Sequence, residues 1–288
     1  MLNDFPDRIP RSCPDRRFYF VDNSLISDAG HAFRNLPFVI HLPTLLAGLR
    51  QHIVNAPWKL VYLWTLCGLR WRIKSPNAIA VVSFYMQNVS QDVVAAQRQA
   101  IRRFLPADVD VVQLKTGFAH GCTIDLFLAF ARYDLILILD IDCIPISAHA
   151  IPSLIEAAKA GALVGAAQRA NHIGNDDHLY VGPFLMGFGR ATHARLGHPS
   201  FRETKRGDVG EELTYRAEAS SVPIRFLWPT SCDEAKWHLT GDIHFGRNTI
   251  YGNEFLHAFE IRRPDQQAAF VATVSRLLLS EASQQPWA

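Results

Sequence analysis

The sequence predicts an α/β fold, Rossmann-like, with a mostly parallel central sheet flanked by helices. Between residues 78 and 168, short apolar runs alternate with segments in which apolar residues recur at helical spacing. Such alternation is typical of strand–helix–strand units, whose helices cover both faces of a parallel sheet. Hydrophobic residues make up 49% and charged residues 19% of the 288 residues, as in globular proteins that form a large core.

The segment before this alternation predicts a mainly helical extension. Residues 1–17 are polar and proline-rich and predict a loosely held arm, and residues 18–22 predict a short strand. Residues 41–73 predict helix, broken near Pro57. The Ser-Pro-Asn sequence at 75–77 ends the extension, because a residue before proline disfavours helical backbone.

The alternating region then follows in chain order. Its predicted strands and helices are, in turn, 78–85 (strand), 90–105 (helix), 109–114 (strand), 123–133 (helix), 135–140 (strand), 149–160 (helix) and 162–168 (strand). The first strand is apolar and β-branched, as in a strand buried on both faces, and Ser90 is the expected N-cap of the first helix. The predicted segments are an extension (1–76), a main domain (77–262) and a C-terminal amphipathic helix (263–288).

Charge and cysteine usage exclude several classes of protein. The net charge of +2 is too small to indicate nucleic acid as a partner. The five cysteines are scattered without a CxxC pair, which argues against a disulfide framework and a structural zinc site. The N-terminus has no signal-peptide pattern. We therefore expect a cytoplasmic protein.

One apolar stretch raises the question of a membrane. Residues 60–69 are apolar but too short to span a bilayer, which takes about 20 residues. Tryptophans and cations between residues 58 and 74 allow peripheral contact with the inner membrane surface. The alternative, a helix packed on the main domain with its basic side chains reaching water, is favoured.

The third predicted strand ends on two carboxylates. In the stretch LILILDIDCIP, an apolar run at residues 135–139 leads directly to Asp140, and Asp142 follows. Ligands bind at the carboxyl ends of parallel strands, and burying a carboxylate is costly unless a partner compensates its charge. Mn²⁺ or Mg²⁺, bound together with a diphosphate, would compensate both aspartates. The alternative is that the two residues cap the following helix.

The same run, with a helix on each side, resembles the D-x-D signature of the GT-A fold glycosyltransferases, in particular family-2-like members. Three later segments of the main domain are similar in order and spacing to segments of that family: 179–197, 207–219 and 243–252. The resemblance implies a metal-dependent, hexosyltransferase-like enzyme. Its donor would be a nucleotide-diphospho-sugar, a UDP- or GDP-sugar, and its acceptor a hydroxyl group of a glycan, a lipid or a small molecule.

The resemblance also implies roles for individual residues. A carboxylate at the start of the helix in 207–219 would be the general base of an inverting reaction, with Glu211 first, Glu212 next and Asp208 third. His244 would be the third metal ligand beside Asp140 and Asp142, and His238 and His257 are poorer candidates for that role. The chain departs from the family where the usual acidic pair reads Glu211-Glu212, and it lacks the basic motif with which some members hold the leaving phosphate.

Polar residues near the ends of the predicted strands are candidates for contacts with the nucleotide. They are Ser83, Tyr85, Thr116, His120, Asp125, Asp140 and Arg247. For Asp125 the favourable charge at a helix start is a sufficient alternative explanation, and for Arg247 the alternative is an ordinary surface arginine.

Two other functions compete with the transferase. A haloacid-dehalogenase-like phosphatase also has an apolar strand ending in D-x-D, with the first aspartate as nucleophile, and Asp176-Asp177 would then be its later acidic pair. In that family the motif opens the fold, whereas here about 60 residues of α/β pattern precede it. A non-catalytic nucleotide-sugar-binding scaffold is the second alternative. The loop at residues 171–177 predicts a solvated turn or a lid.

Overall fold

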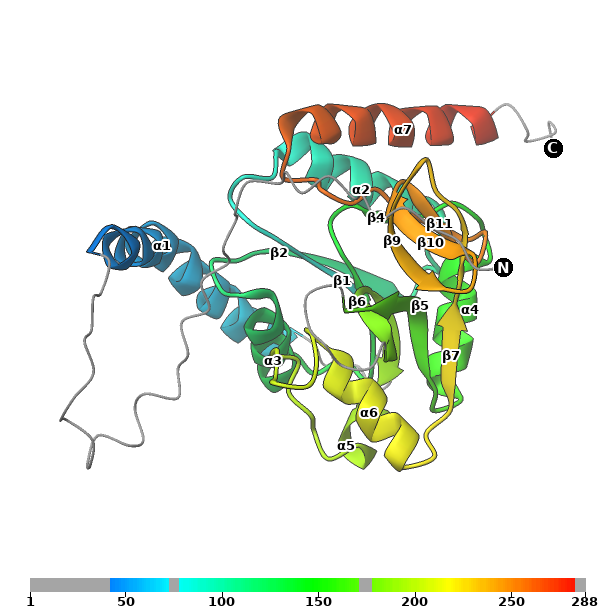
Figure 1. Cartoon of the computed structure of the whole chain (residues 1–288), viewed down its shortest axis with the longest axis horizontal. Coiled ribbons are helices and arrows are strands. Elements are labelled where there is room, and N and C mark those ends of the chain that lie inside the picture. The colour runs from blue at the N-terminus through cyan, green and yellow to red at the C-terminus, as the bar shows by residue number, and fades with distance from the viewer. Residues whose placement is uncertain (1–41, 73–77, 171–177, 283–288) are drawn as a thin grey trace, which may run out of the picture. The chain divides into compact units, whose positions relative to one another are not determined.

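The structure is a computed structural model that describes residues 42–72, 78–170 and 178–282 (Figure 1). Contacts divide the chain into two units, Met1–Ala47 and Gly48–Ala288, and the account below concerns the second. The predicted arm, the strand at 18–22 and the loop at 171–177 lie outside the described residues.

The centre of the molecule is a six-stranded sheet in the order β2-β1-β3-β6-β5-β7. Its strands are β1 (Ile79–Tyr85), β2 (Val109–Lys115), β3 (Leu135–Leu139), β5 (Leu163–Arg169), β6 (Leu179–Gly189) and β7 (Ile224–Leu227). All of them run in one direction except β6, which is antiparallel to both of its neighbours. The predicted α/β fold with a mostly parallel sheet is confirmed.

Helices cover both faces of this sheet. They are α1 (Leu42–Arg72), α2 (Gln91–Arg103), α3 (His120–Phe130), α4 (Ala150–Lys159), α5 (Arg190–Arg195), α6 (Glu211–Ala219) and α7 (Pro264–Ala282). Alternate residues of β1 serve the two faces: Ala80 and Val82 pack with residues of α1, α3 and α6, whereas Ile79 and Val81 pack with residues of α2 and α4. Helix α7 lies along α2 (Figure 1).

A second, smaller sheet was not predicted. It has the order β4-β12-β11-β8, and a hairpin of β9 and β10 accompanies it. The bounds are β4 (Cys143–Pro145), β8 (Pro229–Ser231), β9 (Glu234–Thr240), β10 (Ile243–Arg247), β11 (Thr249–Tyr251) and β12 (Phe255–His257). Strand β4 directly follows the D-x-D turn, and its Cys143 lies opposite His257 of β12. This pairing therefore brings residues from the end of the main domain to the D-x-D motif.

Two predicted helix limits are corrected. Helix α1 runs through Pro57 without a break. Although proline removes a helical hydrogen bond, the following turns pack firmly: Tyr62 and Leu66 are completely buried, and the Tyr62 hydroxyl donates to the Thr123 carbonyl at 2.7 Å. Helix α3 begins at His120 rather than at Thr123.

In the described ranges 42–72, 78–170 and 178–282, no helix is long and apolar enough to cross a membrane.

Arg190 closes the carboxyl end of α3. Its guanidinium donates hydrogen bonds to the backbone carbonyls of Tyr133, Leu128 and Ala131, which have no partner within a helix. Burial lowers the pKa of Arg190, but an arginine keeps its charge at neutral pH. The arginine thus satisfies several carbonyls with one charged group.

We predict that Arg190→Met lowers the free energy of unfolding by about 3 kcal/mol, because charged hydrogen bonds are lost and carbonyls stay buried without donors. Urea denaturation measures this. Arg195→Met is the matched control, because Arg195 is exposed and lies in α5, the helix that also contains Arg190. It should change stability by less than about 0.5 kcal/mol. Equal midpoints for the two variants would contradict the capping role.

Candidate functional site

The D-x-D turn lies at the point where the chain changes direction across the sheet. The connection after β1 leads to β2 on one side, whereas the connection after β3 leads to β5 on the other side. The carboxyl ends of β1 and β3 therefore border the crevice where such folds bind ligands. The turn itself is held by the backbone: Asp140 N–H donates to Phe184 O at 2.8 Å, and Cys143 N–H donates to Asp140 O at 2.8 Å.

Gln97 of α2 fixes the same turn from behind. Its side-chain amide donates to the carbonyls of Asp140 (2.6 Å) and Cys143 (3.1 Å), and its oxygen accepts from Gln113 at 2.8 Å. Gln97 is completely buried. The turn that presents the two carboxylates is therefore rigidly supported, although no sequence pattern indicated the role of this glutamine.

Asp140, Asp142 and His257 form a candidate metal site. Each offers one ligand atom, and the three atoms lie within 4.8 Å of one another. Asp142 and His257 are buried, while 29% of the Asp140 side chain is exposed. The His257 ring stacks on Phe184 at 4.2 Å between centroids, with Nε2 lying 3.3 Å from Asp142 Oδ1. Its buried Nδ1 has no hydrogen-bond partner among the described residues.

The charges around Asp140 show why the site favours a cation. Burial raises the pKa of Asp140, and the neighbouring carboxylate of Asp142 raises it too, whereas His120, His257 and Arg262 act in the opposite direction. His120 Nε2 lies 3.4 Å from Asp140 Oδ1. Among the described residues, no lysine or arginine forms an ion pair with either aspartate. A bound cation between the two aspartates would stabilise both carboxylates.

The histidine that lies beside the two aspartates is His257, and not the predicted His244. His244 is exposed on the β9–β10 hairpin, where its Nδ1 contacts the Asp242 carbonyl at 3.0 Å and its ring meets the edge of His238. His257 lies beside Asp142 because β12 pairs with β4 and Ala258 N–H donates to Asp142 O at 3.0 Å. The only local signal for His257 is its place at the end of a short apolar strand.

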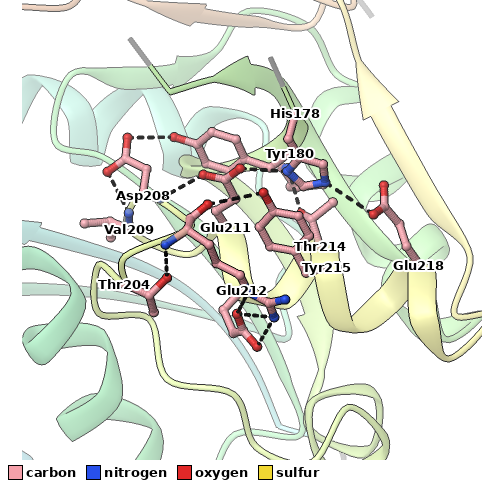
Figure 2. Close-up of polar contacts among 12 residues, drawn as sticks. His178, Tyr180, Thr204, Asp208, Val209, Glu211, Glu212, Thr214, Tyr215 and Glu218 are labelled. Atoms are coloured by element: carbon pink, nitrogen blue, oxygen red, sulfur yellow. Dashed lines mark hydrogen bonds and ion pairs between the residues drawn. The ribbon is translucent and has the colours of Figure 1, made fainter. Parts of the chain in front are cut away.

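A second cluster of polar residues surrounds the start of α6, as Figure 2 shows. Glu211 is completely buried. Its Oε1 lies 2.7 Å from His178 Nδ1, and its Oε2 accepts the Asp208 backbone N–H at 2.8 Å. His178 also stacks on Tyr215 at 3.9 Å. Glu211 therefore holds the loop before α6 against the start of β6.

Asp208 is the partly exposed acid of this cluster (Figure 2). Its Oδ2 accepts from the Tyr180 hydroxyl at 2.9 Å, and its Oδ1 accepts from Val209 N–H at 2.6 Å. Burial, together with the charge of Asp208, raises the pKa of Tyr180, so the phenol stays a donor. Gly210, with φ of 77°, turns the chain into α6; a Cβ there would lie 3.4 Å from Pro183 Cβ, next to the Phe184 that supports Asp140.

Glu212 lies on the other side of α6 and forms ion pairs with two arginines. Two nitrogens of Arg206 donate hydrogen bonds to its carboxylate at 2.7–3.0 Å, and Arg216 Nε donates another at 2.8 Å. Partial burial alone would raise the pKa of Glu212, but the hydrogen bonds from Arg216 and Arg206 hold it below its ordinary value. A carboxylate so stabilised is a weak base.

The residues predicted to contact a nucleotide separate into two groups. Tyr85 and His120 lie at the carboxyl edge of the sheet and are partly exposed. The side chains of the other group are buried or hydrogen-bonded within the protein. Ser83 is completely buried, and Thr116 Oγ1 lies 3.1 Å from Thr123 Oγ1. Asp125 accepts hydrogen bonds from Ser200 Oγ at 2.6 Å and from Phe201 N–H at 2.8 Å.

Arg247 belongs to the structural group as well. It pairs with Glu234 across the β9–β10 hairpin at 3.1 Å and with Glu260, which follows β12, at 3.1 Å. The arginine whose charge acts to lower the pKa of Asp140 is instead the exposed Arg262, which follows β12. It was missed because its position depends on the same β4–β12 pairing that places His257.

Comparisons with known proteins add little to this geometry. No family model matches the sequence, and no curated protein matches it. Among solved structures, a mannosyltransferase from Pyrobaculum calidifontis, crystallised with GDP-Man and Mn²⁺, matches with a TM-score of 0.39 and 11% identity, over 83% of this chain and 87% of that one.

Two further structures are similar to a comparable degree. The 2-C-methyl-D-erythritol 4-phosphate cytidylyltransferase from Thermus thermophilus has a TM-score of 0.35 and 12% identity, over 69% of this chain and 99% of the other. Protein A197 from STIV has a TM-score of 0.33 and 12% identity, over 62% and 93%. At these values the likenesses assign neither an activity nor a ligand to this chain.

Proposed function

We propose that this protein is a metal-dependent glycosyltransferase that moves a sugar from a nucleotide-diphospho-sugar, a UDP- or GDP-sugar, to an acceptor hydroxyl. The observation that carries the proposal is the Asp140–Asp142–His257 group at the carboxyl edge of the sheet. Asp142 is buried, Asp140 is partly exposed, and the buried Nδ1 of His257 has no hydrogen-bond partner among the described residues. A cation would compensate the charge of both carboxylates.

The donor set favours Mn²⁺ over Mg²⁺. Carboxylates suit both ions, but Mg²⁺ prefers oxygen ligands alone, whereas an imidazole nitrogen is acceptable to a transition metal. Asp140, Asp142 and His257 would hold the ion, and its chemistry would be Lewis-acid stabilisation of a diphosphate leaving group. The partial exposure of Asp140 leaves one side of the group open to a ligand.

Residues around the metal group would bind the donor. Arg262 is exposed, interacts favourably with Asp140, and is suited to neutralise a phosphate that gains charge as the sugar leaves. His120, whose Nε2 lies 3.4 Å from Asp140 Oδ1, would be a second group beside the diphosphate. Tyr85, at the end of β1, is the candidate for stacking on the nucleobase.

Asp208 replaces Glu211 as our candidate for the general base of an inverting reaction. The base must reach the acceptor hydroxyl, and a completely buried Glu211 with neighbours at both carboxylate oxygens has no path to it. Asp208 is partly exposed, and its carboxylate is oriented by Tyr180 and by the backbone. Glu211 and His178 would then support the loop that carries the base.

Thermal unfolding with Mn²⁺, with UDP or GDP, and with both tests the proposal. A ligand that binds only the folded chain raises the melting temperature. We expect a clear rise for metal plus nucleotide that exceeds the sum of the separate rises. A phosphatase should respond to metal without nucleotide, and a scaffold without a metal site should respond to nucleotide alone or to neither, so both outcomes would refute the transferase.

The two histidines provide a matched pair of variants. His257→Gln should lower the affinity for Mn²⁺ at least about tenfold, as expected for a metal ligand or its direct support, and should abolish the joint rise. His244→Gln should behave as the unaltered chain, because His244 is exposed on the β9–β10 hairpin. Calorimetric titration with Mn²⁺ measures the affinity. If the His244 variant alone loses the metal, the assignment of His257 is wrong.

A further inference from the structure

Helix α1 presents a contiguous apolar surface to solvent. Its outer face is formed by Leu60, Val61, Leu63, Trp64 and Cys67, which line one shallow surface depression. Leu60 is 69%, Val61 49% and Trp64 82% exposed. Side chains of this size are seldom left together in water, and such patches mark interaction sites.

The opposite face of α1 fixes which side points outward. Tyr62 and Leu66 are completely buried in the core beneath the sheet, and the Tyr62 hydroxyl donates to the Thr123 carbonyl. Trp58 Nε1 donates to Gln87 Oε1 at 2.8 Å. Because these contacts use the inner face, the outer face cannot turn into the core without breaking them. The packing of the inner face thus fixes the outward orientation of these side chains.

The charge of α1 indicates what covers the outer face. Between Leu42 and Arg72 the helix contains no aspartate or glutamate, while it carries four cations: Arg50, Lys59, Arg70 and Arg72. An apolar face with an aromatic residue, on a helix of purely basic charge, matches an anionic lipid surface, with apolar side chains among the acyl chains and cations at the headgroups. A protein partner would require no such uniform charge.

We propose that the outer face of α1 binds the surface of an anionic bilayer, with the helix lying in the plane of the interface. Trp64 would anchor it at headgroup depth. The proposed contact is peripheral, because the helix would lie in the interface and would not cross the bilayer. This inference does not depend on the proposed transferase activity, because it rests on α1 alone.

The position of α1 gives the contact a consequence. A Cβ at Gly117, in the loop after β2, would lie 2.6 Å from the Asn55 carbonyl, and Lys115 lies over the Trp58 ring at 3.6 Å. The helix is thereby attached to the carboxyl edge of the sheet, which also carries Asp140. Membrane binding would therefore hold the candidate metal site near the bilayer surface.

Vesicle sedimentation of the full chain tests the proposal. We expect the protein to sediment with vesicles of phosphatidylcholine and phosphatidylglycerol in equal parts, and much less with phosphatidylcholine alone. The double variant Leu60→Ser/Trp64→Ser should lose at least about tenfold in partition coefficient, since two large apolar side chains no longer leave water. Leu279→Ser is the matched control, because Leu279 on α7 is 71% exposed, and should bind as before.

The electrostatic part has its own pair of variants. Arg70→Gln should weaken binding to anionic vesicles about fivefold, since each cation near such a surface contributes about 1 kcal/mol, whereas Arg225→Gln, at an exposed position of β7, should not. Equal binding to neutral and anionic vesicles would overturn the proposal. An absence of vesicle binding would also overturn it. If the chain then forms a dimer that the Leu60/Trp64 double variant abolishes, a second copy covers the face.

Discussion

Replacing Asp142 by asparagine is expected to abolish metal-dependent nucleotide binding while leaving the fold intact. Asp142 is buried, and its Oδ1 lies 3.3 Å from His257 Nε2. The positions of these two candidate ligand residues therefore depend on each other. An amide keeps the shape but removes the charge that attracts a divalent cation. Loss of a ligand should cost more than the 10–100-fold typical of supporting residues, hence more than about 100-fold in Mn²⁺ affinity.

The measurement is a calorimetric titration of the nucleotide with and without Mn²⁺, accompanied by thermal unfolding of the metal-free variant. We expect the metal-free melting temperature to change by only about 3 °C, because the variant loses one contact with His257 and one repulsion with Asp140. Asp265→Asn, an exposed carboxylate at the start of α7, is the control. Retained metal-dependent affinity in the Asp142 variant would exclude the metal role.

The part of the site that sequence could predict is the part encoded by neighbouring residues. A buried run of five strand residues, Leu135–Leu139, ends on Asp140, and a strand of this type occupies the middle of a parallel sheet. The alternation of strands and helices then places that end at the ligand edge. These inferences need only the local pattern and the handedness of the connections.

The part that escaped prediction depends on pairing between distant segments. His257 and Arg262 reach the metal group only because β12 pairs with β4, more than a hundred residues earlier, and no local pattern specifies such a register. For the same reason the sequence suggested His244, whose strand looks equally suitable but pairs with β9 in an exposed hairpin. The domain limits at residues 76 and 262 stay predictions.

The acidic loop illustrates a different limit. Sequence places three acids at the start of one helix, but it does not tell which is buried. The structure separates them through their partners: Glu211 contacts His178, Glu212 contacts Arg206 and Arg216, and Asp208 contacts Tyr180. Because His178 and Tyr180 come from β6 and the residue just before it, the environment of each acid is set by tertiary packing and not by its place in the helix.

Asp208→Asn is therefore expected to lower kcat by at least about 100-fold, the smaller end of the range for general-base catalysis, while the donor still binds. The single amide oxygen of asparagine can still accept from the Tyr180 hydroxyl or from Val209 N–H, though not from both, and the amide cannot take a proton from a sugar hydroxyl. The assay is turnover of the nucleotide-sugar that a donor panel identifies, together with calorimetric affinity for its nucleotide. A fall in kcat without loss of affinity separates a base from a residue that merely shapes the pocket.

Two neighbouring variants make this test decisive. Glu212→Gln should retain turnover, since Glu212 is held by two arginines on the other side of α6. Glu211→Gln should chiefly lower the melting temperature, because it weakens a buried contact with His178 that holds the loop. If instead Glu211→Gln is stable and inactive while Asp208→Asn turns over normally, the buried glutamate must reach the acceptor through a rearrangement of this loop, and the base is Glu211.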